Sequence, residues 1–163
     1  MPTQEKHTFD QFLTRVSPDD LPFVLELHKS LDERGYRTKV VLAKNGYVLS
    51  YLHPKTKKTL LNYVFRKSGM LMRLYGDHFH NYLDLVRNLP EPVLAQIGAH
   101  TDCKRLLDPG ACSSRCSMGY AFTVGDTLYR KCRYNCFLLP VNGGTAPHLR
   151  ALAEQEARAR ETA

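Results

Sequence analysis

The stretch TLLNYVFRKSGMLMRLYG (residues 59–76) and the stretch before it, RTKVVLAKNGYVLSYLH (residues 37–53), decide the fold of this chain. In both, apolar side chains recur at every second position, which is typical of β-strands. A glycine-containing pair interrupts each stretch, Asn45-Gly46 in one and Ser68-Gly69 in the other, and such pairs favour two-residue hairpin turns. The sequence therefore predicts two consecutive antiparallel hairpins.

Turns at these two pairs would also fix the register of the strands. The predicted opposite pairs are Val40 and Tyr51, Leu42 and Leu49, Tyr63 and Leu74, and Phe65 and Met72. In the second hairpin these side chains share one face with Leu61, so this face is predicted to be core. The other face carries Asn62, Arg66 and Arg73.

Helical patterns flank the predicted strands. Thr8 and Gln11 have the spacing of a capping box, and an amphipathic pattern runs from Leu21 to Gly35. Asp77 is a candidate N-cap for residues 78–89, and a short helix is expected up to Gly98. A C-terminal helix over residues 145–160 carries the docking stripe Leu149, Leu152 and Ala153. This order predicts one α+β domain over residues 1–163, with an antiparallel sheet of consecutive hairpins and helices packed on one face.

The composition narrows the class of protein. Of the 163 residues, 43% are hydrophobic, which suits a globular domain, and no apolar run is long enough to cross a membrane. The polar start MPTQEKHTFDQF does not read as a secretory signal, so we expect a cytoplasmic protein that does not associate with membranes. The net charge of +7 favours anionic partners.

Four of the five cysteines lie in CSSRCSMGYAFTVGDTLYRKCRYNC (residues 112–136). Gly125-Asp126 in this segment fits a type II′ turn, which predicts a third hairpin. Its register pairs Val124 with Thr127, Phe122 with Tyr129 and Tyr120 with Lys131, and its extension places Cys132 across from Gly119 and Cys116 across from Asn135. The hairpin within the cysteine-rich segment 100–140 should therefore bring two Cys-x3-Cys pairs together.

Two cysteine pairs at the base of a hairpin are typical of a structural zinc site. The predicted ligands are Cys112, Cys116, Cys132 and Cys136, and Cys103 is a candidate to replace one of them. Three other interpretations stay open: a disulfide or redox-active dithiol, an iron–sulfur cluster, and cysteines that are simply buried core residues.

The rest of the sequence favours binding over catalysis. It contains no Gly-x-Ser-x-Gly, P-loop, Gly-x-Gly-x-x-Gly or His-Glu-x-x-His motif, its carboxylates form no recognisable acid–base pair, and His78 and His80 are spaced unlike ligands of a shared metal. We therefore expect a zinc-stabilised, non-enzymatic module that binds a small anionic ligand or nucleic acid. The alternatives are a thiol-redox or iron–sulfur sensor or enzyme, and a plain interaction domain with inert cysteines. The basic residues expected to meet the anion are Arg66, Arg73, Arg130 and Arg133.

Residues 103–137 and the hairpin KTLLNYVFRKSGMLMRLYGD (residues 58–77) resemble a family of small cysteine-rich proteins of anaerobic Gram-positive bacteria, and this resemblance implies no known activity. The order of helix, paired hairpins and helix is loosely similar to the YdhG group of frataxin-like α+β proteins. That similarity implies a helix-on-sheet fold and a hint of metal handling. The acidic ridge of iron-binding frataxins is missing here, so iron delivery is not carried over.

Overall fold

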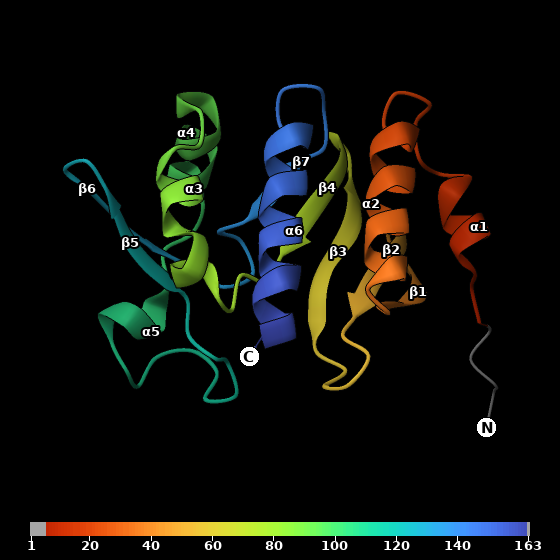
Figure 1. Ribbon diagram of the computed structural model, residues 1–163. Helices are drawn as coiled ribbons and strands as arrows, with labels where there is room; N and C mark the ends of the chain where they lie inside the picture. The colour runs from red at the N-terminus through yellow and green to blue at the C-terminus, as the bar shows by residue number, and fades with distance from the viewer. Residues whose placement is uncertain (1–5, 163) are drawn as a thin grey trace.

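The computed structural model describes residues 6–162 (Figure 1). The helices are α1 (Phe9–Leu13), α2 (Leu21–Glu33), the 3-10 helix η1 (Phe79–Tyr82), α3 (Leu83–Arg87), α4 (Glu91–Ala99), α5 (Lys104–Leu107) and α6 (Ala146–Thr162). The strands are β1 (Arg37–Ala43), β2 (Gly46–Leu52), β3 (Thr59–Arg66), β4 (Gly69–Leu74), β5 (Tyr120–Val124), β6 (Thr127–Lys131) and β7 (Leu138–Pro140).

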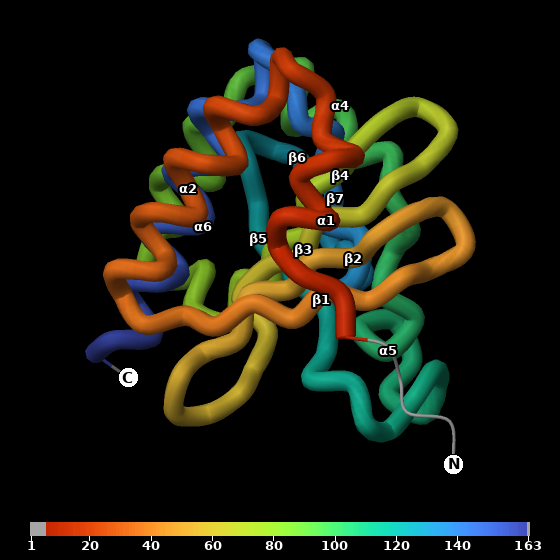
Figure 2. Tube along the Cα trace, turned by 90° about the vertical axis from the view of Figure 1, so that its right-hand side faces the viewer, coloured from red at the N-terminus to blue at the C-terminus, as the bar shows by residue number. Residues whose placement is uncertain are grey.

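The main sheet has five strands in the order β1-β2-β3-β4-β7, and all neighbouring strands are antiparallel. Strands β5 and β6 form a separate two-stranded sheet. Helices α2 and α6 lie together on one side of the main sheet (Figure 2). The predicted α+β class is therefore confirmed. Within residues 6–162, no helix has both the length and the hydropathy that a membrane span requires.

The core lies between the main sheet and these helices. The sheet contributes the predicted apolar face, in which Leu61, Tyr63, Met72 and Leu74 are fully buried. Helix α2 covers it with one apolar stripe, and α6 packs on β3 and β4. The predicted docking stripe of the last helix is confirmed, because all three of its residues are fully buried. The predicted capping box also forms at the start of α1.

The predicted register of the first two hairpins is wrong by two residues. The structure pairs Val40 with Leu49, Leu42 with Tyr47, Tyr63 with Met72, Phe65 with Met70 and Leu61 with Leu74. The central turn residues are Lys44-Asn45 and Lys67-Ser68. Gly46 and Gly69 follow these turns with φ of 132° and 123°, values that glycine adopts without strain. Because a strand alternates with period two, a shift of two residues leaves every side chain on its predicted face.

The third hairpin has the predicted register. Tyr120 pairs with Lys131, Phe122 with Tyr129 and Val124 with Thr127, and Gly125 has the positive φ that its turn requires. The predicted extension beyond this ladder is wrong. Residues 132–136 instead form a tight turn, in which the Cys136 N–H donates to the Cys132 carbonyl at 2.8 Å.

A short segment before α5 closes the outer edge of β6. The Cys103 N–H donates to the Arg130 carbonyl, and the Cys132 N–H donates to the Thr101 carbonyl. Between them, the buried Lys131 ammonium donates to the carbonyls of Gly98 and His100 and to Asp102. The chain then returns to the main sheet as β7, a three-residue strand beside β4 that the sequence analysis did not predict.

Candidate functional site

The five cysteines lie in one region of the chain but in different environments. Cys103 and Cys136 are buried, Cys116 and Cys132 are half-buried, and Cys112 is exposed in a loop where its φ is 63°. Burial raises the pKa of the Cys136 thiol, which disfavours the thiolate that binds metals or reacts with oxidants.

Over residues 6–162, no group of three or more His, Cys, Asp or Glu side chains is arranged so that it could hold a metal ion. All five sequence-predicted ligands fall within this range. The four-cysteine zinc centre and its iron–sulfur alternative remain predictions from the sequence. The candidate site described below consists of other residues.

Of the four predicted anion-binding arginines, all of which lie among the described residues, Arg133 lines the cavity described below and the other three do not. Arg66 is exposed at the end of β3, and Arg130 is exposed on β6. Arg73 donates to the Tyr134 carbonyl at 2.7 Å and to the Asn62 side chain at 3.3 Å, so its guanidinium is already engaged. Arg133 is the exception and lines the cavity described next.

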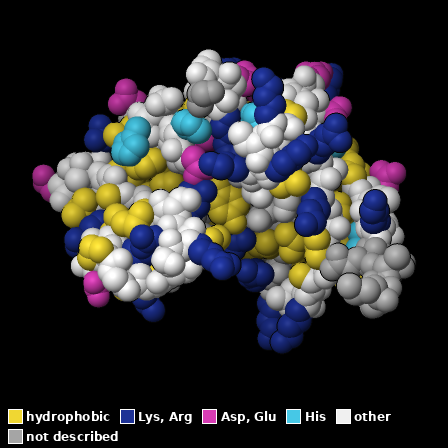
Figure 3. Space-filling model, turned by 90° about the horizontal axis from the view of Figure 1, so that it is seen from below, with side chains coloured by type: hydrophobic (Ala, Val, Ile, Leu, Met, Phe, Trp, Pro, Cys, Tyr) yellow, Lys and Arg dark blue, Asp and Glu magenta, His cyan; other side chains and the backbone are white. Residues whose placement is uncertain are grey.

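The cavity, of about 740 Å³, opens between the main sheet and the cysteine-rich region, and we call it the cleft. Seen from below, Lys and Arg side chains border a hollow in which apolar side chains are visible (Figure 3). The cleft is lined by Arg34, His53, Pro54, Lys55, Thr56 and Lys58, by segments 76–80 and 117–120, and by Arg133, Arg160 and Glu161. Its volume is in the range of small-molecule sites.

Cations outnumber anions along the wall of the cleft. Three of its arginines are paired with acids: Arg34 with Glu161, and Arg133 and Arg160 with Asp77. The remaining two basic side chains, Lys55 and Lys58, form no ion pair with an acid among the described residues, and both are exposed. The cleft therefore carries excess positive charge, which attracts anions.

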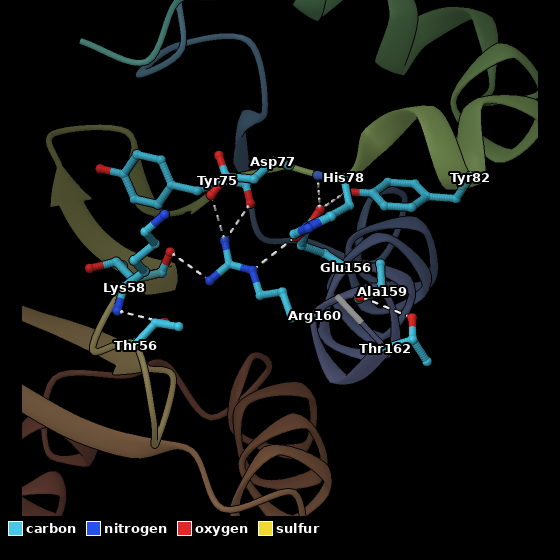
Figure 4. A network of polar contacts seen from close by, with 12 residues as sticks. Thr56, Lys58, Tyr75, Asp77, His78, Tyr82, Glu156, Ala159, Arg160 and Thr162 are labelled. Atoms are coloured by element: carbon cyan, nitrogen blue, oxygen red, sulfur yellow. Dashed lines mark hydrogen bonds and ion pairs between the residues drawn. The ribbon is translucent and has the colours of Figure 1, made fainter. Parts of the chain in front are cut away.

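Arg160, near the end of α6, lines the cleft and lies at the centre of a network of polar contacts (Figure 4). Its guanidinium donates to Glu156 at 2.8 Å, to the carbonyls of Thr59 and Tyr75 at 3.1 and 3.0 Å, and to Asp77 at 3.2 Å. These bonds tie the last turn of α6 to the start of β3 and the end of β4. The predicted role of Asp77 as an N-cap is wrong, because η1 begins without a side-chain cap and the Asp77 carboxylate pairs with Arg133 and Arg160.

Glu156 is fully buried beside this arginine and accepts four hydrogen bonds. Oε1 accepts from the His78 backbone N–H at 2.8 Å and from the Tyr82 hydroxyl at 2.7 Å. Oε2 contacts Nδ1 of His78 and Nε of Arg160, both at 2.8 Å. Burial, and then the neighbouring charge of Glu156, raise the pKa of Tyr82 far above its ordinary value, so this hydroxyl stays a donor.

His53 shapes the lysine-bearing loop on the opposite wall. Its Nδ1 accepts the backbone N–H groups of Lys55 and Thr56, both at 3.2 Å, and therefore holds the loop that presents Lys55 and Lys58. Burial lowers the pKa of His53, and the charges of Arg160 and Lys55 lower it further. Both effects keep this ring neutral, as its two accepted hydrogen bonds require.

Most of this site was not predicted from the sequence. No acid–base pair was recognisable there, yet Glu156 and His78 form one. These two residues lie 78 positions apart, so no local spacing in the sequence indicates their contact. One signal was present: Glu156 falls on the predicted apolar face of the last helix, since it lies three and four residues after Ala153 and Leu152.

Comparisons with known proteins identified no relative of this chain. No protein-family model, no curated protein and no solved structure matches it. The two resemblances suggested by the sequence therefore stay expectations, and the site has to be interpreted from its own geometry.

Proposed function

We propose that the cleft binds a small anionic ligand that carries phosphate or carboxylate groups. The observation that carries the proposal is the pair of exposed lysines, Lys55 and Lys58, which lack acidic partners in the described chain and line a cavity with three arginines. Cations at a partly desolvated site bind anions through charge-assisted hydrogen bonds, which are stronger than neutral ones.

The shape of the site favours a small molecule over a nucleic acid. A cavity of about 740 Å³ suits a ligand the size of a nucleotide or a sugar phosphate. A nucleic acid would be expected to follow a row of cations, but Arg66, Arg73 and Arg130 do not line the cleft. Apolar side chains at Pro54, Phe79, Met118 and Tyr120 offer contacts to the uncharged part of such a ligand.

Titration calorimetry with pyrophosphate at low ionic strength tests this proposal. The wild-type protein should bind one pyrophosphate per chain, and Lys58→Ala should weaken binding about tenfold, since a hydrogen bond to a charged group contributes roughly 1.5–3 kcal/mol. Lys67→Ala is the matched control, because this lysine lies in the β3–β4 turn outside the cleft. Absence of binding, or equal losses in both variants, would contradict a ligand site in the cleft.

A second titration, with single-stranded RNA and DNA, distinguishes the two expected classes of partner, a small anionic ligand and a nucleic acid. We expect binding that is weak and strongly salt-dependent, because it would rest on diffuse surface charge. Tight binding that is lost in Arg66→Ala and Arg130→Ala but kept in Lys58→Ala would instead assign the function to the outer arginines.

A further inference from the structure

We propose that His78 is a general base at the cleft, and that the anion bound there is a phosphate ester that the protein hydrolyses. This inference rests on the proposed function and adds a reaction to it. It is carried by three observations: the hydrogen bonds around Glu156, the accessibility of the second nitrogen of His78, and the cations on the surrounding wall.

The first observation fixes the position of the proton on the imidazole ring. Oε1 of Glu156 accepts from the His78 backbone N–H and the Tyr82 hydroxyl, and Oε2 accepts from the Arg160 guanidinium, which is always charged, so Glu156 is a carboxylate. A carboxylate only accepts hydrogen bonds, and therefore Nδ1 of His78 carries the hydrogen in the 2.8 Å contact. In the neutral ring Nε2 is then the atom with the free lone pair.

The second observation concerns the surroundings of Nε2. The His78 side chain lines the cleft and is 32% exposed, whereas its partner Glu156 is completely buried. No hydrogen bond within the described chain engages Nε2, and Nε2 is not among the buried polar atoms that lack a partner. The lone pair is therefore accessible from the cleft, where it can take a proton from a bound water molecule.

The third observation selects the substrate class. In phosphoryl transfer, negative charge is spread over the oxygens around phosphorus, and fixed cations stabilise it. Lys58 and Arg133 lie on the wall of the same cavity as His78, and Arg133 is held in place by Asp77. Phe79 and Met118 provide an apolar surface for the alcohol part of the ester.

The reaction consumes one water molecule and needs no other co-reactant. As the water oxygen forms a bond to phosphorus, one water proton moves to Nε2 of His78. The bond between phosphorus and the ester oxygen breaks, and the ester oxygen leaves with the electron pair. The ester oxygen takes up a proton from solvent water and becomes an alcohol, and the phosphate product keeps the oxygen of the attacking water. The imidazolium releases its proton to solvent, so His78 is neutral again.

The test measures release of p-nitrophenol from p-nitrophenyl phosphate and from bis(p-nitrophenyl) phosphate by the untagged protein of residues 1–163. His78→Gln keeps an amide donor for Glu156 but has no basic nitrogen, and it should lower kcat/KM at least about 100-fold, within the range for loss of a general base. Its affinity for pyrophosphate should change less than threefold. His148→Gln, on α6 outside the cleft, is the matched control and should keep full activity.

The outcomes separate this inference from the proposed function. Pyrophosphate binding without wild-type turnover of either ester would overturn the reaction and leave the binding site standing, whereas neither binding nor turnover would overturn both. Equal losses of activity in His78→Gln and His148→Gln would exclude His78 as the base. A long-range ¹H–¹⁵N spectrum gives an independent readout, since the neutral His78 ring must carry its hydrogen on Nδ1, and a hydrogen on Nε2 would overturn the inference.

Discussion

Glu156 and His78 are joined by two hydrogen bonds of 2.8 Å, although they lie 78 residues apart in the chain. One oxygen of the buried carboxylate accepts the His78 backbone N–H, and the other contacts the imidazole ring. The same carboxylate holds Arg160, which reaches the ends of two strands. This arrangement fixes the last helix to the sheet and also orients a ring at the wall of the cleft.

Glu156→Gln should therefore destabilise the protein strongly. The amide would place an N–H group against other donors, and Arg160 would lose its nearest counter-charge, so we expect the free energy of unfolding to fall by about 3 kcal/mol, as when a buried ion pair loses one partner. Urea unfolding followed by circular dichroism measures this change. Glu154→Gln is the control, because this partly exposed residue of the same helix pairs with Arg150 at the surface, and its loss should cost at most about 0.5 kcal/mol. Similar losses in both variants would contradict the buried network.

Gly119 should tolerate no side chain at the base of the third hairpin. A Cβ atom added there would lie 2.2 Å from the Lys131 carbonyl oxygen and 2.7 Å from the Cys103 Cβ atom, and neither backbone nor buried neighbour can move easily. Gly119→Ala should lower the free energy of unfolding by about 2 kcal/mol or more. Gly143→Ala is the control, because open space surrounds that position. If both variants unfold at the same temperature, Gly119 does not pack closely against Lys131 and Cys103 as described.

The fold was predictable wherever local sequence specifies it. Alternation of period two identified β1 to β4 and the buried face of β3 and β4, and Gly125 predicted the turn of the third hairpin correctly. The register of the first two hairpins was not predictable from Asn45-Gly46 and Ser68-Gly69. Glycine is favoured at the second central position of a type I′ turn, and it is also favoured directly after the two central residues of a type I turn. Strand β7 has only three residues and depends on its pairing with β4, so its own sequence carries no signal.

The candidate site was less predictable than the fold. Arg133 was identified from its basic neighbourhood. Lys58 and His78 line one cavity, and Glu156 contacts His78, only because the hairpins and the last helix fold together. Net charge indicated an anionic partner and gave no location. The spacing of the cysteines along the sequence predicted a metal centre. Such a centre requires four sulfur atoms close together in space, and spacing along the sequence does not determine the distances between them.

The contact between Lys131 and Asp102 makes one part of the stability depend on pH. The hydrogen bond from the buried ammonium, followed by its charge, holds the pKa of Asp102 below its ordinary value of 3.8. A lowered folded-state pKa stabilises the protein at pH values above the ordinary one, and this stabilisation disappears as the pH falls through the lowered value. Asp102→Asn should therefore reduce the midpoint of thermal unfolding at pH 7 and have little effect at pH values below the lowered pKa. If the substitution lowers the unfolding midpoint equally at both pH values, the charge of Asp102 does not contribute to stability.

The cysteines should react with iodoacetamide in an order set by their exposure. Cys112 should react first, Cys116 and Cys132 later, and the buried Cys103 and Cys136 only after unfolding. Mass spectrometry of peptides from protein alkylated for increasing times measures this order. Joint protection of Cys112, Cys116, Cys132 and Cys136, released by a chelator together with one zinc per chain, would contradict the order and establish the metal centre predicted from the sequence.

The central claim is that the excess charge of the cleft forms a specific anion site, and NMR titration with pyrophosphate tests it most directly. With amide resonances assigned, the shifts should concentrate in residues 53–56, 58, 76–80 and 117–120, which line the cleft from three parts of the chain. They should saturate together with a single dissociation constant. Shifts that spread over β3, β6 and other basic surfaces without saturation would show diffuse attraction by a basic protein, and would contradict a binding site in the cleft.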